Sequence, residues 1–124
     1  MTRTATTREQ DPVEPGHVNA VRLVGRISGD PEETTLPSGD TVWNFRLVVE
    51  RPPDRSRPGQ SVDTLDCAVW SGRTKRSVPS WTGGDLVEVE GSVRRRFYST
   101  GAGKASRYEV EVRKGRLICR AASG

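Results

Sequence analysis

The segment from Gly84 to Tyr98 constrains the fold of this chain more than any other. Its apolar side chains alternate with polar ones, so that Val87, Val89 and Val93 share one face. The opposite face carries the polar and charged side chains Glu88, Glu90, Ser92, Arg94 and Arg96. A period of two predicts a β-strand with one buried face. Gly91 falls on the apolar face in mid-strand, which indicates a bend or a close backbone approach of the kind that small closed barrels need.

The same segment ends in three arginines, Arg94, Arg95 and Arg96, followed by the aromatic pair Phe97 and Tyr98. Cations beside flat rings suit a single-stranded nucleic acid, because its phosphates attract cations and its unpaired bases stack on aromatic faces. A solvated hairpin carrying ordinary surface arginines is the alternative interpretation. The segment taken alone does not decide between the two.

The remaining alternation predicts four further principal strands, one additional short strand and a barrel. We expect a strand that begins after His17 and runs to Ile27, a break at Gly29–Pro31, and a short strand over Glu32–Leu36 before a turn at Pro37–Asp40. The other expected strands are Thr41–Glu50, Thr64–Trp70 and Arg107–Arg113, with Leu117–Cys119 closing the domain. Ser71–Thr82 predicts a short helix, shortened at Pro79. The fold class is therefore all-β: a five-stranded OB-fold barrel with one short helical segment and long basic hairpin loops.

The 124 residues suit one domain with a modest core, and the net charge of +4 permits an anionic partner. Residues 1–16 are polar and predict a disordered leader, residues 17–120 the folded domain, and residues 121–124 a short tail. No apolar run could span a bilayer and no signal-peptide pattern appears, so we expect a cytoplasmic, nucleoid-associated protein.

Two further regions could contact a nucleic acid. The connection over residues 51–63 is rich in proline and carries Arg51, Arg55 and Arg57, which predicts either a basic arm that follows a phosphate backbone or a soluble loop. Trp70 falls on the polar side of its strand, as a subunit contact or as a stacking platform. Trp81, in contrast, is expected in the core.

Enzyme and metal chemistry lack the residues they require. The only histidine, His17, lies at the edge of the leader, so no nucleophile has an oriented base. Cys67 and Cys119 have no metal-ligand spacing and are expected to be reduced thiols, with a disulfide as the minor alternative. Gly101–Lys104 resembles a phosphate-binding loop but lacks its strand–loop–helix context. We expect no enzyme activity and no cofactor.

Short motifs along residues 18–119 resemble the bacterial single-stranded-DNA-binding protein family. Their order and spacing carry the resemblance: Val-Asn-x-Val-x-Leu-Val-Gly-Arg, Asp-Pro-Glu, Pro-Ser-Gly, Asn-Phe, Asp-Cys-x-x-Trp, Gly-Asp-Leu-Val-x-Val-Glu-Gly and Arg-Tyr-x-x-Glu-Val. The resemblance implies an OB fold, usually a homotetramer, that wraps single-stranded DNA without sequence preference in replication, repair and recombination. It implies no cofactor.

Carried over by position, the resemblance implies that Trp70 and Tyr98 stack on bases. It also implies backbone contacts for arginines at or near the family's basic positions, namely Arg73, Arg94, Arg96 and Arg107. Two other aromatic sites of the family fall on about Thr64 and Pro53, which cannot stack as rings. Trp43 stands where the family usually has a small residue, and its inward parity favours a core or interface position.

The family's acidic, aromatic-ended C-terminal region has no counterpart after Arg120, so we expect no tail-mediated recruitment of replication proteins. Ala20 and Val24 on the outer face of the first strand favour a homo-oligomer, most simply a tetramer. Two other functions stay open. One is an RNA-binding or primosome-type OB protein, and the other is an oligomeric protein-interaction module that has lost DNA binding.

Overall fold

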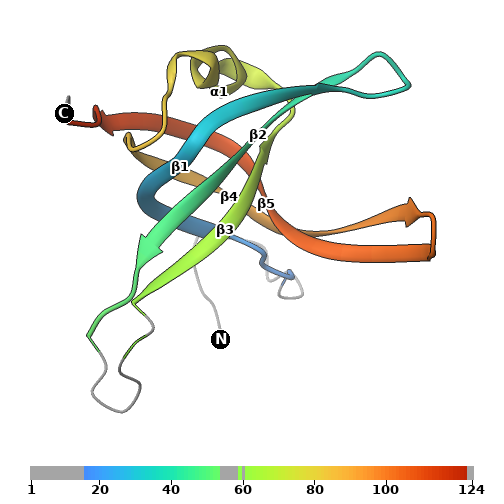
Figure 1. The fold of residues 1–124 in the computed structure, drawn as a ribbon, viewed down its shortest axis with the longest axis horizontal. Helices are drawn as coiled ribbons and strands as arrows, with labels where there is room; N and C mark the ends of the chain where they lie inside the picture. The colour runs from blue at the N-terminus through green and yellow to red at the C-terminus, as the bar shows by residue number, and fades with distance from the viewer. Residues whose placement is uncertain (1–15, 54–58, 60, 123–124) are drawn as a thin grey trace, which may run out of the picture.

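The computed structural model describes residues 16–53, 59 and 61–122, and in them the chain forms one closed barrel. Its elements in chain order are β1 (Val21–Thr35), β2 (Thr41–Glu50), β3 (Val62–Val69), α1 (Gly72–Ser77), the 3₁₀ turn η1 (Val78–Ser80), β4 (Leu86–Thr100) and β5 (Gly103–Cys119). The strands close in the order β1-β2-β3-β5-β4, and all pairs are antiparallel except β3 with β5 (Figure 1). This confirms the predicted five-stranded barrel of the OB type with one short helix.

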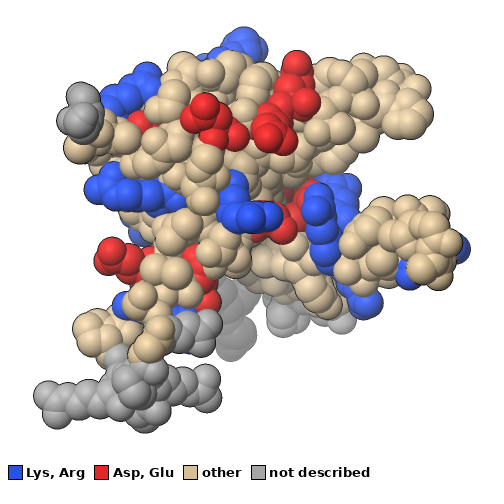
Figure 2. All heavy atoms as spheres, viewed as in Figure 1, with Lys and Arg blue, Asp and Glu red and all other residues tan. Residues whose placement is uncertain are grey.

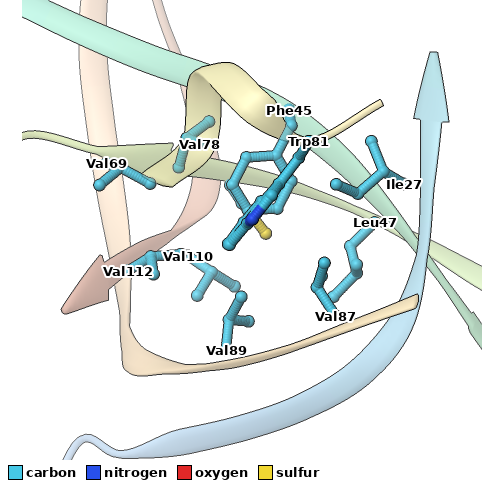
Figure 3. Close-up of a cluster of buried hydrophobic side chains, with 11 residues drawn as sticks. Ile27, Phe45, Leu47, Val69, Val78, Trp81, Val87, Val89, Val110 and Val112 are labelled. Carbon is cyan, nitrogen blue, oxygen red and sulfur yellow. The ribbon is translucent and has the colours of Figure 1, made fainter. Parts of the chain in front are cut away.

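The core is aliphatic around two aromatic rings (Figure 3). Phe45 and Trp81 meet edge to face, with ring centroids 5.7 Å apart. Val69, Val87 and Val89 are fully buried beside them. Each such side chain contributes roughly 1.5–3 kcal/mol by leaving water. The predicted core position of Trp81 is thus confirmed, and Trp43 lies half-buried against the same cluster.

Gly91 is where β5 passes closest to β4. A Cβ at this position would overlap the backbone oxygen of Glu111, and the β4–β5 register shifts between Glu90 and Gly91. The close backbone approach predicted for this glycine is confirmed. Beyond it, β4 and β5 stay paired up to Thr100 and Gly103 and leave the barrel as a hairpin (Figure 1).

Two predicted boundaries are wrong. The chain does not break at Gly29–Pro31: β1 continues to Thr35, and a register shift between Ser28 and Glu32 absorbs the irregular residues. The predicted strand Arg107–Arg113 and the closing segment Leu117–Cys119 are one longer strand, β5, which begins at Gly103, so only Gly101 and Ala102 form the turn after β4. The hairpin signals were correct, but the pairing extends further than the side-chain pattern alone predicts.

Val93 lies on the strand face that was predicted to be buried, yet it is exposed, and so is Tyr108 on the neighbouring strand. Val93 lies opposite Val110, and Arg95, two residues after Val93 on β4, lies opposite Tyr108. Because side chains alternate along a strand, Val93 and Tyr108 share one face with the buried Val110. That face is covered inside the barrel and uncovered once the hairpin has left it. Alternation identified the face correctly but not the point at which its covering layer ends.

The end of the barrel is fixed by a buried carboxylate. Asp85 accepts hydrogen bonds from the backbone N–H of Thr82 and Ala121 and from Arg120. Burial opposes its ionisation, but these bonds outweigh burial and hold the pKa of Asp85 below its ordinary value.

Neither helix in the described residues is long and apolar enough to cross a membrane. Of the predicted leader and tail, residues 1–15 and 123–124 lie outside the described residues, and both boundaries stay predictions.

Candidate nucleic-acid interface

Two hairpins project from the same side of the barrel (Figure 1). The first, the β1–β2 hairpin (residues 29–41), carries carboxylates and neither a basic nor an aromatic residue. The second, the β4–β5 arm (residues 94–108), carries five basic and three aromatic residues. In Figure 2 the end of the β1–β2 hairpin is free of Lys and Arg, whereas blue side chains surround the arm. The arm is therefore the candidate interface.

One side of the arm, which we call the stacking face, consists of Arg95, Phe97 and Tyr108. Arg95 and Phe97 alternate along β4, and Tyr108 lies opposite Arg95 on β5. The Arg95 guanidinium carbon lies 5.1 Å from the centroid of the Phe97 ring and 5.7 Å from that of Tyr108. Its Nε and Nη2 donate to Ser106 Oγ at 3.2 and 3.1 Å. A cation held between two rings is a preorganised platform for a base and its phosphate.

Both rings of the stacking face are accessible: Phe97 is 70% exposed and Tyr108 65% exposed. No carboxylate of the described residues forms an ion pair with Arg95. Arg95 and Phe97 were among the predicted site residues, and Tyr108 was not. The missed signal is the pair Arg107-Tyr108, which repeats the basic–aromatic pattern of β4 on the returning strand.

The other side of the arm, which we call the paired face, carries Tyr98 and three arginines that contact two glutamates. Arg94 Nε lies 2.9 Å from Glu111 Oε1, and Arg96 Nε lies 2.7 Å from Glu109 Oε2. Arg107 Nη2 lies 3.7 Å from Glu109 Oε1. These ion pairs neutralise much of the charge that the sequence suggested was available to phosphates. Tyr98, 46% exposed, lies further along the same face.

Trp70 joins the paired face to the barrel. The guanidinium carbon of Arg96 lies 4.8 Å from the Trp70 ring centroid, within the range of a cation–π contact. The ring is half-buried, and its Nε1 is shielded from solvent without a hydrogen-bond acceptor in the described structure. A buried donor without a partner costs free energy.

The structure brings together seven of the predicted site residues: Trp70, Arg94, Arg95, Arg96, Phe97, Tyr98 and Arg107. The other predicted residues do not join them. Arg73 is exposed on α1, which lies apart from the arm in Figure 1. Arg51 follows β2 and forms a two-point ion pair with Asp63 that raises the pKa of the arginine and lowers that of the aspartate. Arg55 and Arg57 lie outside the described residues, while Pro53 and Thr64 are exposed.

A hollow of about 410 Å³ is lined by residues of β1, β2, β3 and β5, including residues of both projecting hairpins. Its charged lining consists of four carboxylates and two arginines: Asp30, Glu32, Asp66, Glu109, Arg46 and Arg107. Arg46 already pairs with Asp66, at 3.3 Å. Three of these carboxylates, Asp30, Glu32 and Asp66, disfavour a phosphate on the β1–β3 side of the hollow, whereas Arg107 and Glu109 also belong to the paired face of the arm.

Neither cysteine belongs to a candidate site. Cys67 and Cys119 are free thiols in the structure. Burial, together with the negative charges of Asp66 and Glu109, raises the pKa of Cys67 to about 12, which keeps this thiol protonated and unreactive. The described residues contain no cluster of side chains suited to hold a metal ion.

Comparison with known proteins agrees with this geometry. The model of the single-strand binding protein family matches residues 18–118, which cover the entire barrel. The chain belongs to this family. A relative called single-stranded DNA-binding protein in Halalkalibacterium halodurans is 33% identical over 87 residues, 70% of this chain and 52% of the relative. Single-stranded DNA-binding protein 3 of Listeria innocua is 36% identical over 87 residues, 70% of this chain and 54% of the relative.

Among solved structures, the Plasmodium falciparum SSB complex with ssDNA superimposes with a TM-score of 0.68 at 23% sequence identity. The match covers 86% of this chain and 98% of that one, which supports the OB-type barrel as the family fold. The chain spans about half the length of the curated relatives it matches, 52% and 54% for the two named above.

Proposed function

We propose that this protein is a non-catalytic binding protein for single-stranded DNA that grips the strand by the β4–β5 arm without reading its sequence. The observation that carries the proposal is the stacking face, where a cation lies between two exposed rings on an extended hairpin. Such platforms accept any unpaired base, because every base has an aromatic face. Family membership supports a role in replication, repair or recombination, with the nucleoid in the cytoplasm as the site of action.

The residues divide the work by chemistry. Phe97, Tyr98 and Tyr108 would stack on successive bases, and Arg95 would meet a phosphate beside them. Trp70 would take a base at the foot of the arm, where Arg96 lies over its ring in the free protein. Asp30, Glu32 and Asp66 would keep the phosphate backbone away from the β1–β3 side of the hollow.

A titration with matched single- and double-stranded oligonucleotides at two salt concentrations tests this function. We expect clear preference for the single strand at both salt concentrations, since stacking requires unpaired bases, and weaker binding at the higher one. Equal affinity for duplex and single strand would contradict the proposal and indicate a generic basic surface. Competition with RNA of the same sequence distinguishes the RNA-binding alternative, which predicts that RNA displaces the DNA.

We also propose that the protein acts as a homotetramer. Its support is the outer side of β1, where the exposed Ala20 and the half-buried Val24 lie beside the charged Arg22. Sedimentation at micromolar concentration should give a species of four chains, and a 13.6 kDa monomer would contradict it.

A further inference from the structure

Glu109 is buried within an interface whose expected ligand is an anion. Its side chain is 5% exposed, and it accepts the hydrogen bond from Arg96 Nε at 2.7 Å. Arg107 approaches its other oxygen at 3.7 Å. The carboxylate thus occupies the position relative to these two guanidiniums that a phosphate would take. The same arginine, Arg96, covers the Trp70 ring.

A second carboxylate has the same arrangement elsewhere in the barrel. Glu88, with a side chain 10% exposed, accepts a hydrogen bond from Arg22 and one from Arg116 at 2.8 Å. It lies on β4 before Gly91, opposite Arg116 of β5 and Val24 of β1, and not on the arm. Glu88 is therefore a matched control: a buried glutamate between two arginines that is remote from the aromatic residues of the arm.

We propose that Glu109 is an internal competitor for the DNA phosphate: it holds Arg96 over Trp70 in the free protein and must surrender that arginine before Trp70 can stack. The inference rests on the proposed function. A bound strand would take the Arg96 guanidinium from Glu109, and the Trp70 ring, whose Nε1 lacks an acceptor in the described structure, would be free to reorient. Glu109 acts through Arg96 and is a positioning residue.

The competition has a measurable signature in the salt dependence of binding. A phosphate contact on single-stranded DNA contributes about 0.7 to the log–log slope of affinity against salt, because a counterion leaves the DNA. When the contacting arginine leaves a carboxylate, that carboxylate recruits a cation and cancels part of the release. Arg96 should therefore contribute less than the full amount while Glu109 is present.

The test is a double-mutant cycle on the full chain with an oligo-dT probe. Glu109→Gln should steepen the slope by up to about 0.7, since Arg96 then retains only the contact with Glu111 at 3.7 Å, or by up to about 1.4 if Arg107 is released as well, and should tighten binding at low salt. Arg96→Gln should lower the slope clearly less in the unmodified protein than in the Glu109→Gln background, where the loss should approach about 0.7. Glu88→Gln removes the same charge and should leave slope and affinity unchanged.

Two results would overturn the inference while leaving the proposed function intact. One is a salt slope for Glu109→Gln equal to that of the unmodified protein, and the other is an Arg96→Gln effect of the same size in both backgrounds. Failure of the unmodified protein to bind oligo-dT would overturn both. If Glu109→Gln does not fold, Arg96→Gln is compared with Arg95→Gln. The inference requires Arg95→Gln to lower the slope by about 0.7 and Arg96→Gln to lower it clearly less.

Discussion

The β1–β2 hairpin and the β4–β5 arm both extend paired strands beyond the barrel wall, and they present opposite chemistry there. Over residues 29–41 the β1–β2 hairpin carries four acidic residues, Asp30, Glu32, Glu33 and Asp40, and no ring. Over residues 94–108 the arm carries five basic residues and three aromatic ones. The barrel supplies the geometry of both, so the geometry alone does not make a binding surface. The proposed binding surface therefore depends on the side chains of the arm.

The largest effect should follow from removing the rings of the stacking face. Phe97→Ala combined with Tyr108→Ala should cost about 2–6 kcal/mol of binding, at about 1–3 kcal/mol per stacked base, which is roughly a 30-fold loss or more. Fluorescence anisotropy with an oligo-dT probe measures it. Thr35→Ala on the β1–β2 hairpin is the control and should bind normally. Unchanged DNA affinity of the double variant would contradict the proposal that the arm, and not the β1–β2 hairpin, binds the strand by stacking.

Gly91 tests whether the arm depends on how it leaves the barrel. Gly91→Ala would force a Cβ into the backbone of Glu111 and should lower the free energy of unfolding by about 1–3 kcal/mol. Gly101→Ala at the tip of the arm meets open space and should be neutral. Urea denaturation of both variants compares them. Equal stability of the two would show that the close approach at Gly91 is not a constraint.

The two faces of the arm should differ in their dependence on salt. Arg95→Gln should flatten the log–log salt slope by about 0.7, because Arg95 has no carboxylate partner in the described structure. Arg94→Gln should flatten it less, because Arg94 already pairs with Glu111 at 2.9 Å. Titrations at four salt concentrations give both slopes. A larger effect from Arg94 would reverse the roles of the two faces.

The smallest effect is expected on the β1–β2 hairpin itself. Glu32→Gln with Glu33→Gln should tighten binding slightly, by less than about 1 kcal/mol, since exposed charges are screened and these repel the strand. The same titration measures the change. Weaker DNA binding would mean that the β1–β2 hairpin contacts the strand, and would contradict the expectation that only the β4–β5 arm does.

The sequence predicted the barrel because alternation is a property of each strand on its own. Thr41–Glu50 has the predicted bounds, and the close backbone approach at Gly91 and the core position of Trp81 were also correct. The extent of the hairpins was not predictable in the same way. Whether the face bearing Val93 and Tyr108 is buried depends on where the opposite wall of the barrel ends, which no local pattern records.

The candidate site was predictable by residue type and not by pairing. The run Arg94–Tyr98 pointed to the arm, but only the strand register places Tyr108 opposite Arg95. The same register places Arg94 opposite Glu109 and Ser92 opposite Glu111. Arg94 pairs with Glu111 and Arg96 pairs with Glu109, so both arginines are already neutralised. These pairings could not be predicted from the sequence, because the partners are 17 and 13 residues apart in the chain.

The most direct test is to observe which backbone amides respond when an oligo-dT strand is added to ¹⁵N-labelled protein, by TROSY NMR. We expect chemical-shift changes over residues 94–108 and at Trp70, while the amides of residues 29–41 stay unchanged. A duplex of the same length should not give this pattern. Changes centred on the β1–β2 hairpin, with the arm unaffected, would contradict this expectation.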